Sequence, residues 1–449
     1  MQAKRDVRLD EAVPRYTSYP TAPHFHAGVT GETVREWIAA IPAGDPLSLY
    51  LHVPFCDRLC WFCACHTKQT RQYDPVAAYV TSLCREIETV GSLVAGRASV
   101  GAIHFGGGSP TMLTPSDMHR LSDALRQRFV LAPDAEISVE IDPNDMTTDR
   151  LDALAAIGMT RASLGVQDFD PKVQAAINRE QSFESTRDVV EGLRARGVGS
   201  VNLDLLYGLP HQDCDTLART VEQALSLAPD RIALFGYAHV PWFKKHQTMI
   251  PEDALPGSRE RYDQALMAAR MIEDAGYQRI GLDHFARPGD GMAVAARDGR
   301  LKRNFQGYTE DACETLIGLG ASSISRYRQG HAQNQPATGA YQRMVDDGGL
   351  ATARGVAFTE EDRARGWVIE SLMCNFAFDA REAKDRFGAA ATPLVAIAAA
   401  LAQSSPDPML RHEDDLFVVP ELHRPLVRTV AARFDAYLEM GQARHSVAV

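Results

Sequence analysis

The sequence predicts an α/β protein: a partial (β/α)6-type barrel with an N-terminal segment and a mostly α-helical C-terminal domain. Short β-rich runs alternate with helical patterns from about residue 47 to about residue 285. Such alternation indicates a parallel sheet with right-handed crossovers. Roughly six strand–helix units suit a partial or full barrel better than a doubly wound sheet, although periodicity alone leaves the second arrangement open. From about residue 350 onward the pattern becomes helical.

The expected strands are short and rich in β-branched residues. They are SLYLHV, VGAIHFGGG, AEISVEIDP, ASLGVQ, SVNLDLLYG and DRIALFGYAHV, with YQRIGLDHF as a further strand. One helix between them has a complete start signal, with Thr114 as N-cap, Pro115 in the first turn and Asp117 as the acid of a capping box. Gly158 and Gly197 fall where helices should end before the next strand.

The chain is expected to divide into three regions. These are an N-terminal segment over 1–40, the barrel over 41–350 and the helical domain over 351–449. The first region contains RYTSYPTAPHFH, which has too many aromatic residues and prolines for a flexible tail, so we expect it to be ordered against the body. The third contains TEEDRARGWVIESLMC and RPLVRTVAARFDAYLEM, whose apolar spacing is typical of helices.

Composition limits the classes of function. Lys and Arg number 47 against 58 Asp and Glu, and the net charge of −11 argues against broad binding to nucleic acid or to an anionic membrane. The N-terminus carries charges where a signal peptide needs an apolar region. No apolar run approaches the roughly 18 residues of a membrane span. We therefore expect a cytoplasmic protein, and a monomer because no dimerisation surface stands out.

Four of the eight cysteines lie within ten positions, in PFCDRLCWFCACHT. In a reducing compartment such clustering favours metal ligands over disulfides. Cys56, Cys60 and Cys63 follow the first expected strand, and barrel chemistry collects on loops at that end of the strands. Three thiolates can hold three irons of a [4Fe–4S] cluster and leave the fourth iron open. The alternative is a zinc knuckle that takes Cys65 or His66 as its fourth ligand.

The other four cysteines, Cys84, Cys214, Cys313 and Cys374, are scattered among apolar neighbours. We expect them to be buried thiols without chemical function.

The C-x3-C-x2-C spacing, with the aromatic Phe62 before the third cysteine, resembles the signature of the radical S-adenosylmethionine enzymes. The resemblance implies that the open iron chelates S-adenosylmethionine. The run GGGSP at 106–110 resembles the glycine turn of that family, with serine in place of the usual threonine. By the same resemblance the cofactor-binding positions are Tyr50, Phe62, Gly107, Gly108, Ser109, Glu140, Gln167, Arg179, Asp204, Ala238 and Ile324.

Three stretches, RYTSYPT, YLHVPFC and RNFQGYT, together with AQNQ at 332–335, narrow the resemblance to the oxygen-independent coproporphyrinogen III oxidases. The resemblance covers about residues 8 to 376. It implies oxidative decarboxylation of two propionates of coproporphyrinogen III to vinyl groups, giving protoporphyrinogen IX in haem biosynthesis. Gln306, Ile324 and His52 match positions implicated in activity, and a second S-adenosylmethionine beside the first belongs to the same picture. Cys65 matches a cysteine that does not bind the cluster.

The implied substrate carries four carboxylates and therefore needs local positive charge in an acidic protein. Arg15, Arg287, Lys302 and Arg303 are the candidates, because a planar guanidinium can hold a carboxylate with two hydrogen bonds. Each is also readily explained as a solvated surface charge. A radical reaction needs a sealed site, so we expect the N-terminal segment and the C-terminal domain to act as lids.

Other functions are compatible with the cysteine motif. The first alternative is a haem chaperone of the same family, which would bind and deliver haem without turning over a porphyrinogen. A radical enzyme that modifies haem and a non-catalytic iron–sulfur protein are two further alternatives. The electron donor and the acceptor are not indicated by the sequence.

Overall fold

The computed structural model describes residues 11–404 and 407–438. The described residues form two compact units. The barrel unit comprises His26–Leu255 and Cys313–Ala357, and the second unit is built from the other described residues. This grouping does not test the division at residues 40 and 350 that the sequence suggested, which stays a prediction.

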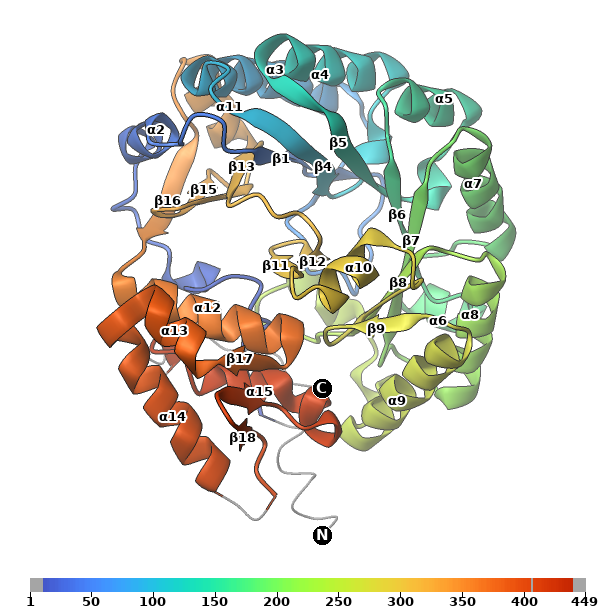
Figure 1. Cartoon of the computed structure of the whole chain (residues 1–449). Helices are drawn as coiled ribbons and strands as arrows, with labels where there is room; N and C mark the ends of the chain where they lie inside the picture. The colour runs from blue at the N-terminus through green and yellow to red at the C-terminus, as the bar shows by residue number, and fades with distance from the viewer. Residues whose placement is uncertain (1–10, 405–406, 439–449) are drawn as a thin grey trace. The chain divides into compact units, whose positions relative to one another are not determined.

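The barrel unit contains the six parallel strands that the sequence predicts, as neighbours in chain order. They are β1 (Leu47–Val53), β4 (Ser99–Gly107), β5 (Val130–Ile141), β6 (Arg161–Gln167), β7 (Ser200–Tyr207) and β8 (Arg231–Gly236). Helices lie along the outer side of this curved sheet (Figure 1). They are α3 (Asp74–Val94), α4 (Pro115–Arg128), α5 (Thr148–Ala156), α6 (Pro171–Ala176), α7 (Phe183–Ala195) and α8 (Cys214–Ser226). The (β/α)6-type barrel is confirmed.

The sheet also extends beyond β1 in a way that the sequence did not indicate. β13 (Thr315–Leu319) pairs with β1 in parallel, and β14 (Ile324–Tyr327), β15 (Gly330–Asn334) and β16 (Thr352–Ala357) continue it as antiparallel strands. Two helices complete the unit, α2 (Gly31–Ala39) and α11 (Thr338–Asp346).

Alternation of side chains along the strands separates the core from the barrel interior. On β1, Leu49 and Leu51 are 1% and 0% exposed, whereas Tyr50 between them is half-buried. The same alternation appears on β6, where Leu164 and Val166 are buried beside half-buried Gln167. Successive residues of a strand point to opposite faces, so the polar members of each strand line the interior.

Most of the expected helix ends are present. Thr114 Oγ1 accepts the backbone N–H of Asp117 at 3.3 Å, and Pro115 begins α4. The capping box is incomplete, because Tyr73 Oη donates to the Asp117 carboxylate and accepts the N–H of Thr114. Gly158 and Gly197 follow α5 and α7 with φ of 88° and 83°, the left-handed region that glycine reaches without a Cβ penalty.

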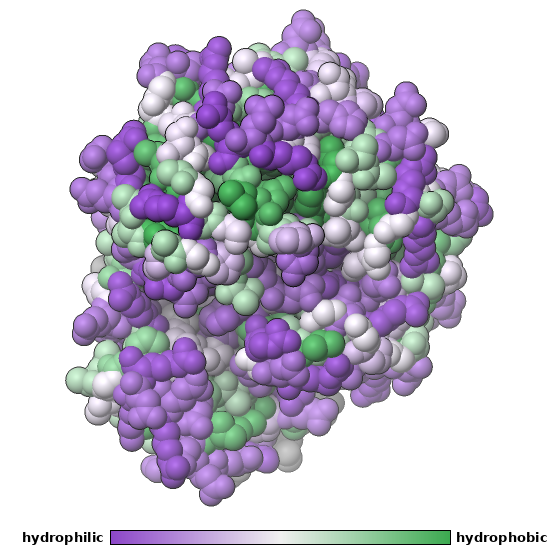
Figure 2. Space-filling model, turned by 45° about the horizontal axis from the view of Figure 1, so that its top comes forward, coloured by the Kyte–Doolittle hydropathy of each residue, from purple (hydrophilic) through white to green (hydrophobic). Residues whose placement is uncertain are grey.

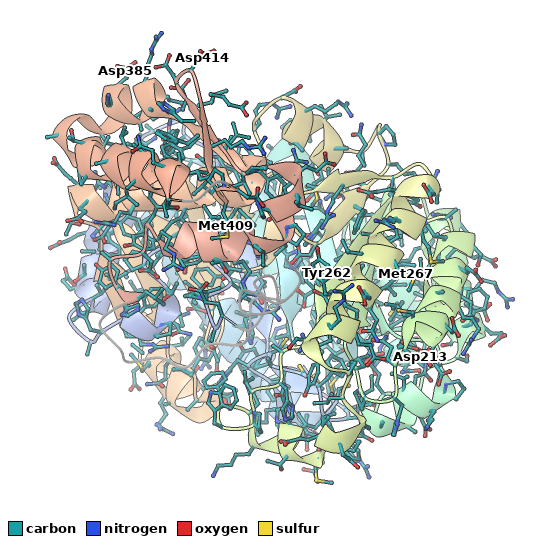
Figure 3. All side chains as sticks on the ribbon, turned by 90° about the horizontal axis from the view of Figure 1, so that it is seen from below. Asp213, Tyr262, Met267, Asp385, Met409 and Asp414 are labelled. Carbon is teal, nitrogen blue, oxygen red and sulfur yellow. The ribbon has the colours of Figure 1, made fainter. Side chains whose placement is uncertain are left out.

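The second unit has its own core, built around α12 (Glu360–Asn375). Tyr16 and Tyr19 of RYTSYPT belong to this core, and Tyr16 Oη donates to Asp435 Oδ2 at 3.0 Å. The expectation that this segment is ordered is therefore confirmed. Met409 and Tyr262, labelled in Figure 3, pack against Leu426 of the same unit.

The remaining helices and strands of this unit are mostly short. They are α9 (Ser258–Asp274), α10 (Gly291–Arg297), α13 (Ala380–Phe387), α14 (Thr392–Gln403), α15 (Val427–Ala432), β11 (Lys302–Asn304), β12 (Gly307–Thr309), β17 (Ala377–Asp379), β18 (Arg411–Glu413) and β19 (Leu416–Val418). The mostly helical C-terminal part thus also contains a three-stranded sheet, β17-β19-β18.

The prediction of a single strand in YQRIGLDHF is wrong. The segment forms two antiparallel strands of the second unit, β9 (Gln278–Ile280) and β10 (His284–Ala286). Gly281 turns the chain between them with φ of 56°, and a Cβ there would collide with the ring of Tyr308. The sequence pattern did not reveal this turn because a lone glycine within a strand pattern also occurs in bulges.

Two expectations from the sequence need correction, one about a membrane-spanning segment and one about the burial of cysteines. The helical stretch Ala380–Gln403 is long and apolar enough to cross a membrane by length and composition, contrary to the expectation that no segment is. Only 17% of its apolar window is buried, with Leu394 and Ala398 among the residues that pack into the core of the second unit. A single helix of this kind is weak evidence for a membrane span. Among the scattered cysteines, Cys84 and Cys374 are buried as expected, whereas Cys214 and Cys313 are half-buried. Hydrophilic side chains cover most of the face shown in Figure 2.

Candidate active site

The cysteine loop leaves the carboxyl end of β1 and returns beside it. Its two short strands, β2 (Phe55–Cys56) and β3 (Lys68–Gln69), pair in parallel. The glycine turn after β4 holds the start of the loop, since Gly108 N–H donates to Val53 O at 2.9 Å and Ser109 N–H donates to Phe55 O at 2.7 Å. The loop therefore lies at the edge of the sheet where barrel enzymes carry their active sites.

The three cysteines expected to bind metal lie close enough to influence one another's charge. Burial raises the pKa of Cys56, and the negative charges of Cys63 and Cys60 raise it further. The pKa of Cys63 is lowered, first by a hydrogen bond from the Cys65 side chain and in part by Lys244 and Arg179. Thiols crowded in this way gain from binding positively charged iron, because a metal ion favours the thiolate.

The donor set fits an iron–sulfur cluster better than a zinc ion. Within 11–404 and 407–438, no three His, Cys, Asp or Glu side chains are arranged to hold a single metal ion. A cubane makes a different demand, because each of three thiolates binds its own iron. His66, one of the two fourth ligands that the zinc alternative offers, instead directs Nε2 to the carbonyl oxygen of Pro336 at 2.8 Å.

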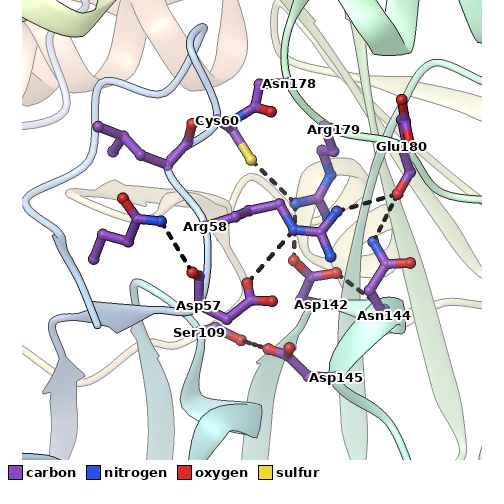
Figure 4. Close-up of polar contacts among 12 residues, drawn as sticks. Asp57, Arg58, Cys60, Ser109, Asp142, Asn144, Asp145, Asn178, Arg179 and Glu180 are labelled. Carbon is purple, nitrogen blue, oxygen red and sulfur yellow. Dashed lines mark hydrogen bonds and ion pairs between the residues drawn. The ribbon is translucent and has the colours of Figure 1, made fainter. Parts of the chain in front are cut away.

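Arg179 connects the cysteine loop to the neighbouring strand ends (Figure 4). Its Nη1 lies 2.9 Å from Asp142 Oδ2 and 3.6 Å from Cys60 Sγ, and its Nη2 donates to Gly165 O at 2.7 Å. Burial opposes its charge, but Asp142 and Cys60 raise the pKa of Arg179 above its ordinary value. Burial raises the pKa of Cys60, because it disfavours the thiolate, and the Arg179 cation counteracts part of that increase. Arg179 is thus a fixed cation beside a cluster ligand, and its contact with S-adenosylmethionine stays a prediction.

His52 and Tyr50 form a hydrogen-bonded pair on β1. His52 Nε2 lies 3.0 Å from the carbonyl oxygen of His66, which can only accept, so Nε2 carries the proton. Its Nδ1 then accepts from Tyr50 Oη at 3.0 Å. Burial lowers the pKa of His52 to about 4, so the ring is neutral at pH 7. In this state His52 fixes the orientation of the tyrosine and of the loop carbonyl.

Glu140 is the anionic group of the barrel interior. Its carboxylate accepts the N–H of Gly107 at 3.0 Å and lies 3.2 Å from His104 Nε2. Burial alone would raise the pKa of Glu140, but the hydrogen bonds and the charge of His104 outweigh it and keep the pKa below its ordinary value. The ring of His104 stacks on Tyr50, with centroids 5.7 Å apart.

The glycine turn is required by close packing. Gly107 has φ of 115°, and a Cβ there would lie 2.6 Å from the ring of His52. A Cβ on Gly108 would lie 2.5 Å from Phe55 O. The Ser109 hydroxyl donates to Asp145 at 2.5 Å, so it anchors the turn to the loop after β5.

Two further expected ligands lie on neighbouring strands. Gln167 ends β6 with φ of 68°, and a Cβ built on Gly165 would come within 3.0 Å of its amide nitrogen. Asp204 on β7 is paired in register with Gly165 and accepts hydrogen bonds from Ser163 and Asn202 at 3.1 and 2.8 Å. Both side chains are half-buried.

Ile324 also lies in the barrel unit, near the residues of β1. It begins β14, whose backbone passes Gly318 so closely that a Cβ on that glycine would lie 2.8 Å from Ile324 O. Gly318 is in turn paired with Tyr50. Gln306 belongs to the second unit, where it is exposed and its N–H donates to Asn304 Oδ1 at 2.9 Å. The structure therefore groups the other fifteen expected residues in one unit and does not place Gln306 relative to them.

Three side chains that the sequence did not suggest hold the cysteine loop from the segment after β8. Lys244 Nζ donates to Cys65 O at 2.7 Å, and His246 Nε2 donates to Cys63 O at 2.7 Å. Gln247, fully buried, donates to Phe62 O at 2.8 Å and to Ala238 O at 3.2 Å. No motif marks them, because they act on backbone carbonyls of the cysteine loop that lie 179 to 185 positions away. The position of the segment after a strand was the one available signal.

The AQNQ motif contacts Glu86 of α3 and the turn at Gly320. Asn334 Nδ2, Tyr341 Oη and Gly320 N–H donate to the Glu86 carboxylate at 2.6, 2.7 and 2.6 Å. Tyr79 connects the same region to β1, because its hydroxyl donates to His52 O at 2.7 Å and accepts the N–H of Ala321 at 2.8 Å. The motif thus fixes the turn that precedes Ile324.

The four cations proposed for propionates all lie in the second unit. Arg303 is buried, stacks 4.3 Å above the centroid of Tyr308 and donates to Arg15 O at 3.3 Å. Lys302 lies 3.7 Å from Glu370, and Arg287 lies 5.6 Å from the ring of Tyr277. These contacts do not test the role in substrate binding, which stays a prediction.

Comparisons with known proteins agree with this geometry. The model of the radical SAM superfamily matches residues 50–224. Oxygen-independent coproporphyrinogen III oxidase of Paracoccus denitrificans is 50% identical over 100% of this chain and 99% of its own length. The protein of that name from Bradyrhizobium diazoefficiens is 49% identical over 98% of each chain.

Among solved structures, coproporphyrinogen III oxidase (HemN) from Escherichia coli, described as a radical SAM enzyme, has a TM-score of 0.90 at 38% identity. The match covers 95% of this chain and 100% of that one. With the cysteine loop, the glycine turn and the barrel in place, the chain belongs to the oxygen-independent coproporphyrinogen III oxidase family of the radical SAM superfamily.

Proposed function

We propose that this protein catalyses the oxygen-independent oxidative decarboxylation of two propionate side chains of coproporphyrinogen III to vinyl groups, giving protoporphyrinogen IX. The observation that carries this proposal is 50% identity, over the whole chain, to a protein named for that activity. The haem chaperone gains no support, since the relatives and the solved structure described above are all named as oxidases.

The residues of the barrel unit fit the cofactors of this reaction. Cys56, Cys60 and Cys63 would hold three irons of a [4Fe–4S] cluster, and the polar side chains inside the barrel would bind S-adenosylmethionine. When bound, these groups would supply radical chemistry that removes a hydrogen atom from the propionate β-carbon, so that CO2 is lost and one electron passes to an external acceptor as the vinyl group forms. A second S-adenosylmethionine beside the first remains part of the proposal.

The chain's own residues prepare the site for this chemistry. Arg179 supplies a fixed positive charge next to Cys60. Neutral His52 holds the loop carbonyl of His66, and anionic Glu140 holds the backbone of the glycine turn. Because these groups are already hydrogen-bonded, they need little reorganisation when cofactors bind. The lid role of the N-terminal segment and the C-terminal part is a further proposal.

We also propose that the protein works as a cytoplasmic monomer with an external electron donor and acceptor, without binding nucleic acid or membrane. The acid excess, 58 against 47, supports the last point.

The test is anaerobic reconstitution with iron and sulfide, followed by addition of coproporphyrinogen III, S-adenosylmethionine and a reductant. Formation of protoporphyrinogen IX, CO2 and 5′-deoxyadenosine is the expected result. Haem binding without turnover would support the chaperone instead.

A further inference from the structure

Large apolar side chains are exposed in one short segment of the barrel unit, the segment 242–249. Trp242 is 51% exposed, Phe243 is 72% exposed and Met249 is 56% exposed. The segment follows β8 and includes the short 3-10 helix η4 (Lys245–Met249). Exposed aromatic and methionine side chains are enriched where proteins dock, and grouped apolar exposure marks such surfaces.

This segment is attached directly to the cysteine loop. Lys244 and His246 donate to the carbonyl oxygens of Cys65 and Cys63, each at 2.7 Å. A molecule docked on this segment would therefore contact the stretch of chain whose side chains hold the backbone of Cys63, an expected cluster ligand, and of its neighbour Cys65.

The segment and the loop are also basic, in contrast to the rest of the chain. The stretches 56–71 and 238–250 contain five Lys or Arg residues and one acid, whereas the chain has a net charge of −11. The ammonium of Lys244 lies 5.3 Å from the ring centroid of Phe243, so positive charge and aromatic surface are combined. Charge complementarity favours an acidic partner and increases its rate of association.

We propose that the segment 242–249 is the docking surface of an acidic protein that carries single electrons to the cluster. The inference rests on the proposed function, because that reaction requires an electron from outside. In the step, the carrier is oxidised by one electron and the cluster is reduced by one, with no bond made or broken. Electron-transfer encounters use small interfaces, which a short segment can provide. A tetrapyrrole would need a concave site that buries most of its surface, which does not suit a phenylalanine as exposed as Phe243.

The test compares two double variants of the reconstituted full-length protein. The first is Phe243→Ser with Lys245→Glu, which leaves the Lys244 and His246 contacts to the loop in place. The matched control is Leu422→Ser with Lys384→Glu, which changes an exposed apolar side chain and an exposed lysine of the second unit. The probe is a purified acidic flavodoxin, reduced before use. The measurements are its Kd and the rate of 5′-deoxyadenosine formation with flavodoxin or with dithionite.

The first variant should bind flavodoxin about tenfold more weakly and lose flavodoxin-driven turnover in proportion, with its dithionite-driven rate unchanged, while the control behaves as wild type. Added salt should weaken wild-type binding. An unchanged Kd would overturn the proposal, as would an equal loss with dithionite, which would assign the segment to the substrate or cofactor site. Wild-type protein that forms no 5′-deoxyadenosine with dithionite would overturn the proposed function, so the two failures are distinguishable.

Discussion

Protonation of Glu86 should make the stability of the barrel unit depend on pH. Glu86 is 3% exposed, and burial raises its pKa from 4.5 to about 7 even though Tyr341, Gly320 and Asn334 donate to it. The native state therefore binds the proton more tightly than the unfolded chain does. As a result, the free energy of unfolding should fall as pH rises from about 4.5 to about 7, and this contribution should stay lost at higher pH.

The magnitude follows from the change in pKa. Each tenfold change in proton affinity is about 1.4 kcal/mol, so a rise from 4.5 to about 7 corresponds to roughly 3 kcal/mol across the window. Glu86→Gln cannot ionise and should not show this decline. Glu88→Gln, on the exposed face of the same helix, should retain it.

The assay is urea unfolding of the three proteins at a series of pH values, followed by circular dichroism. Subtracting the Glu86→Gln curve from wild type removes the contributions of other acids, among them Asp145 and Asp168, whose pKa values burial also raises. Parallel curves for wild type and Glu86→Gln would refute the reasoning, because they would mean that Glu86 has the same proton affinity in both states.

Three further predictions concern the cysteine loop and the turn beside it. Cys56→Ser, Cys60→Ser or Cys63→Ser should each abolish the cluster, whereas Cys65→Ser should retain it, as measured by bound iron and visible absorbance. A cluster lost with Cys65→Ser but kept with Cys63→Ser would contradict the assignment of the ligands. Gly107→Ala should cost about 2–4 kcal/mol of unfolding free energy, because of its positive φ and its overlap with His52. Gly289→Ala, where a Cβ meets nothing within 4 Å, should be nearly neutral in thermal unfolding. Gln247→Leu leaves the carbonyl oxygens of Phe62 and Ala238 without a donor, a cost of about 1–3 kcal/mol, and should speed iron release to a chelator. Gln127→Leu on exposed α4 should not, and equal rates would argue against the role of Gln247.

Much of the barrel could be predicted because its signals are local. Strand–helix alternation gave the six parallel strands, and the spacing of Cys56, Cys60 and Cys63 indicated the chemistry of the loop. Local patterns did not predict the turn in YQRIGLDHF, because the contact that requires a glycine at position 281 is with the ring of Tyr308, which is distant in sequence. They also missed Lys244, His246 and Gln247, whose partners are backbone carbonyls without any side-chain signature.

The sequence by itself determined which groups are available: three thiols with the spacing for a cubane, a glycine turn and polar residues at alternate strand positions. These depend on residue type and on the two-residue period of a strand, both of which are local properties of the sequence. The tertiary structure alone decided which cation stands beside Cys60, which tautomer His52 adopts and which distant segment holds the loop. Those outcomes depend on distances and burial between residues far apart in the chain, and such quantities exist only once the chain has folded.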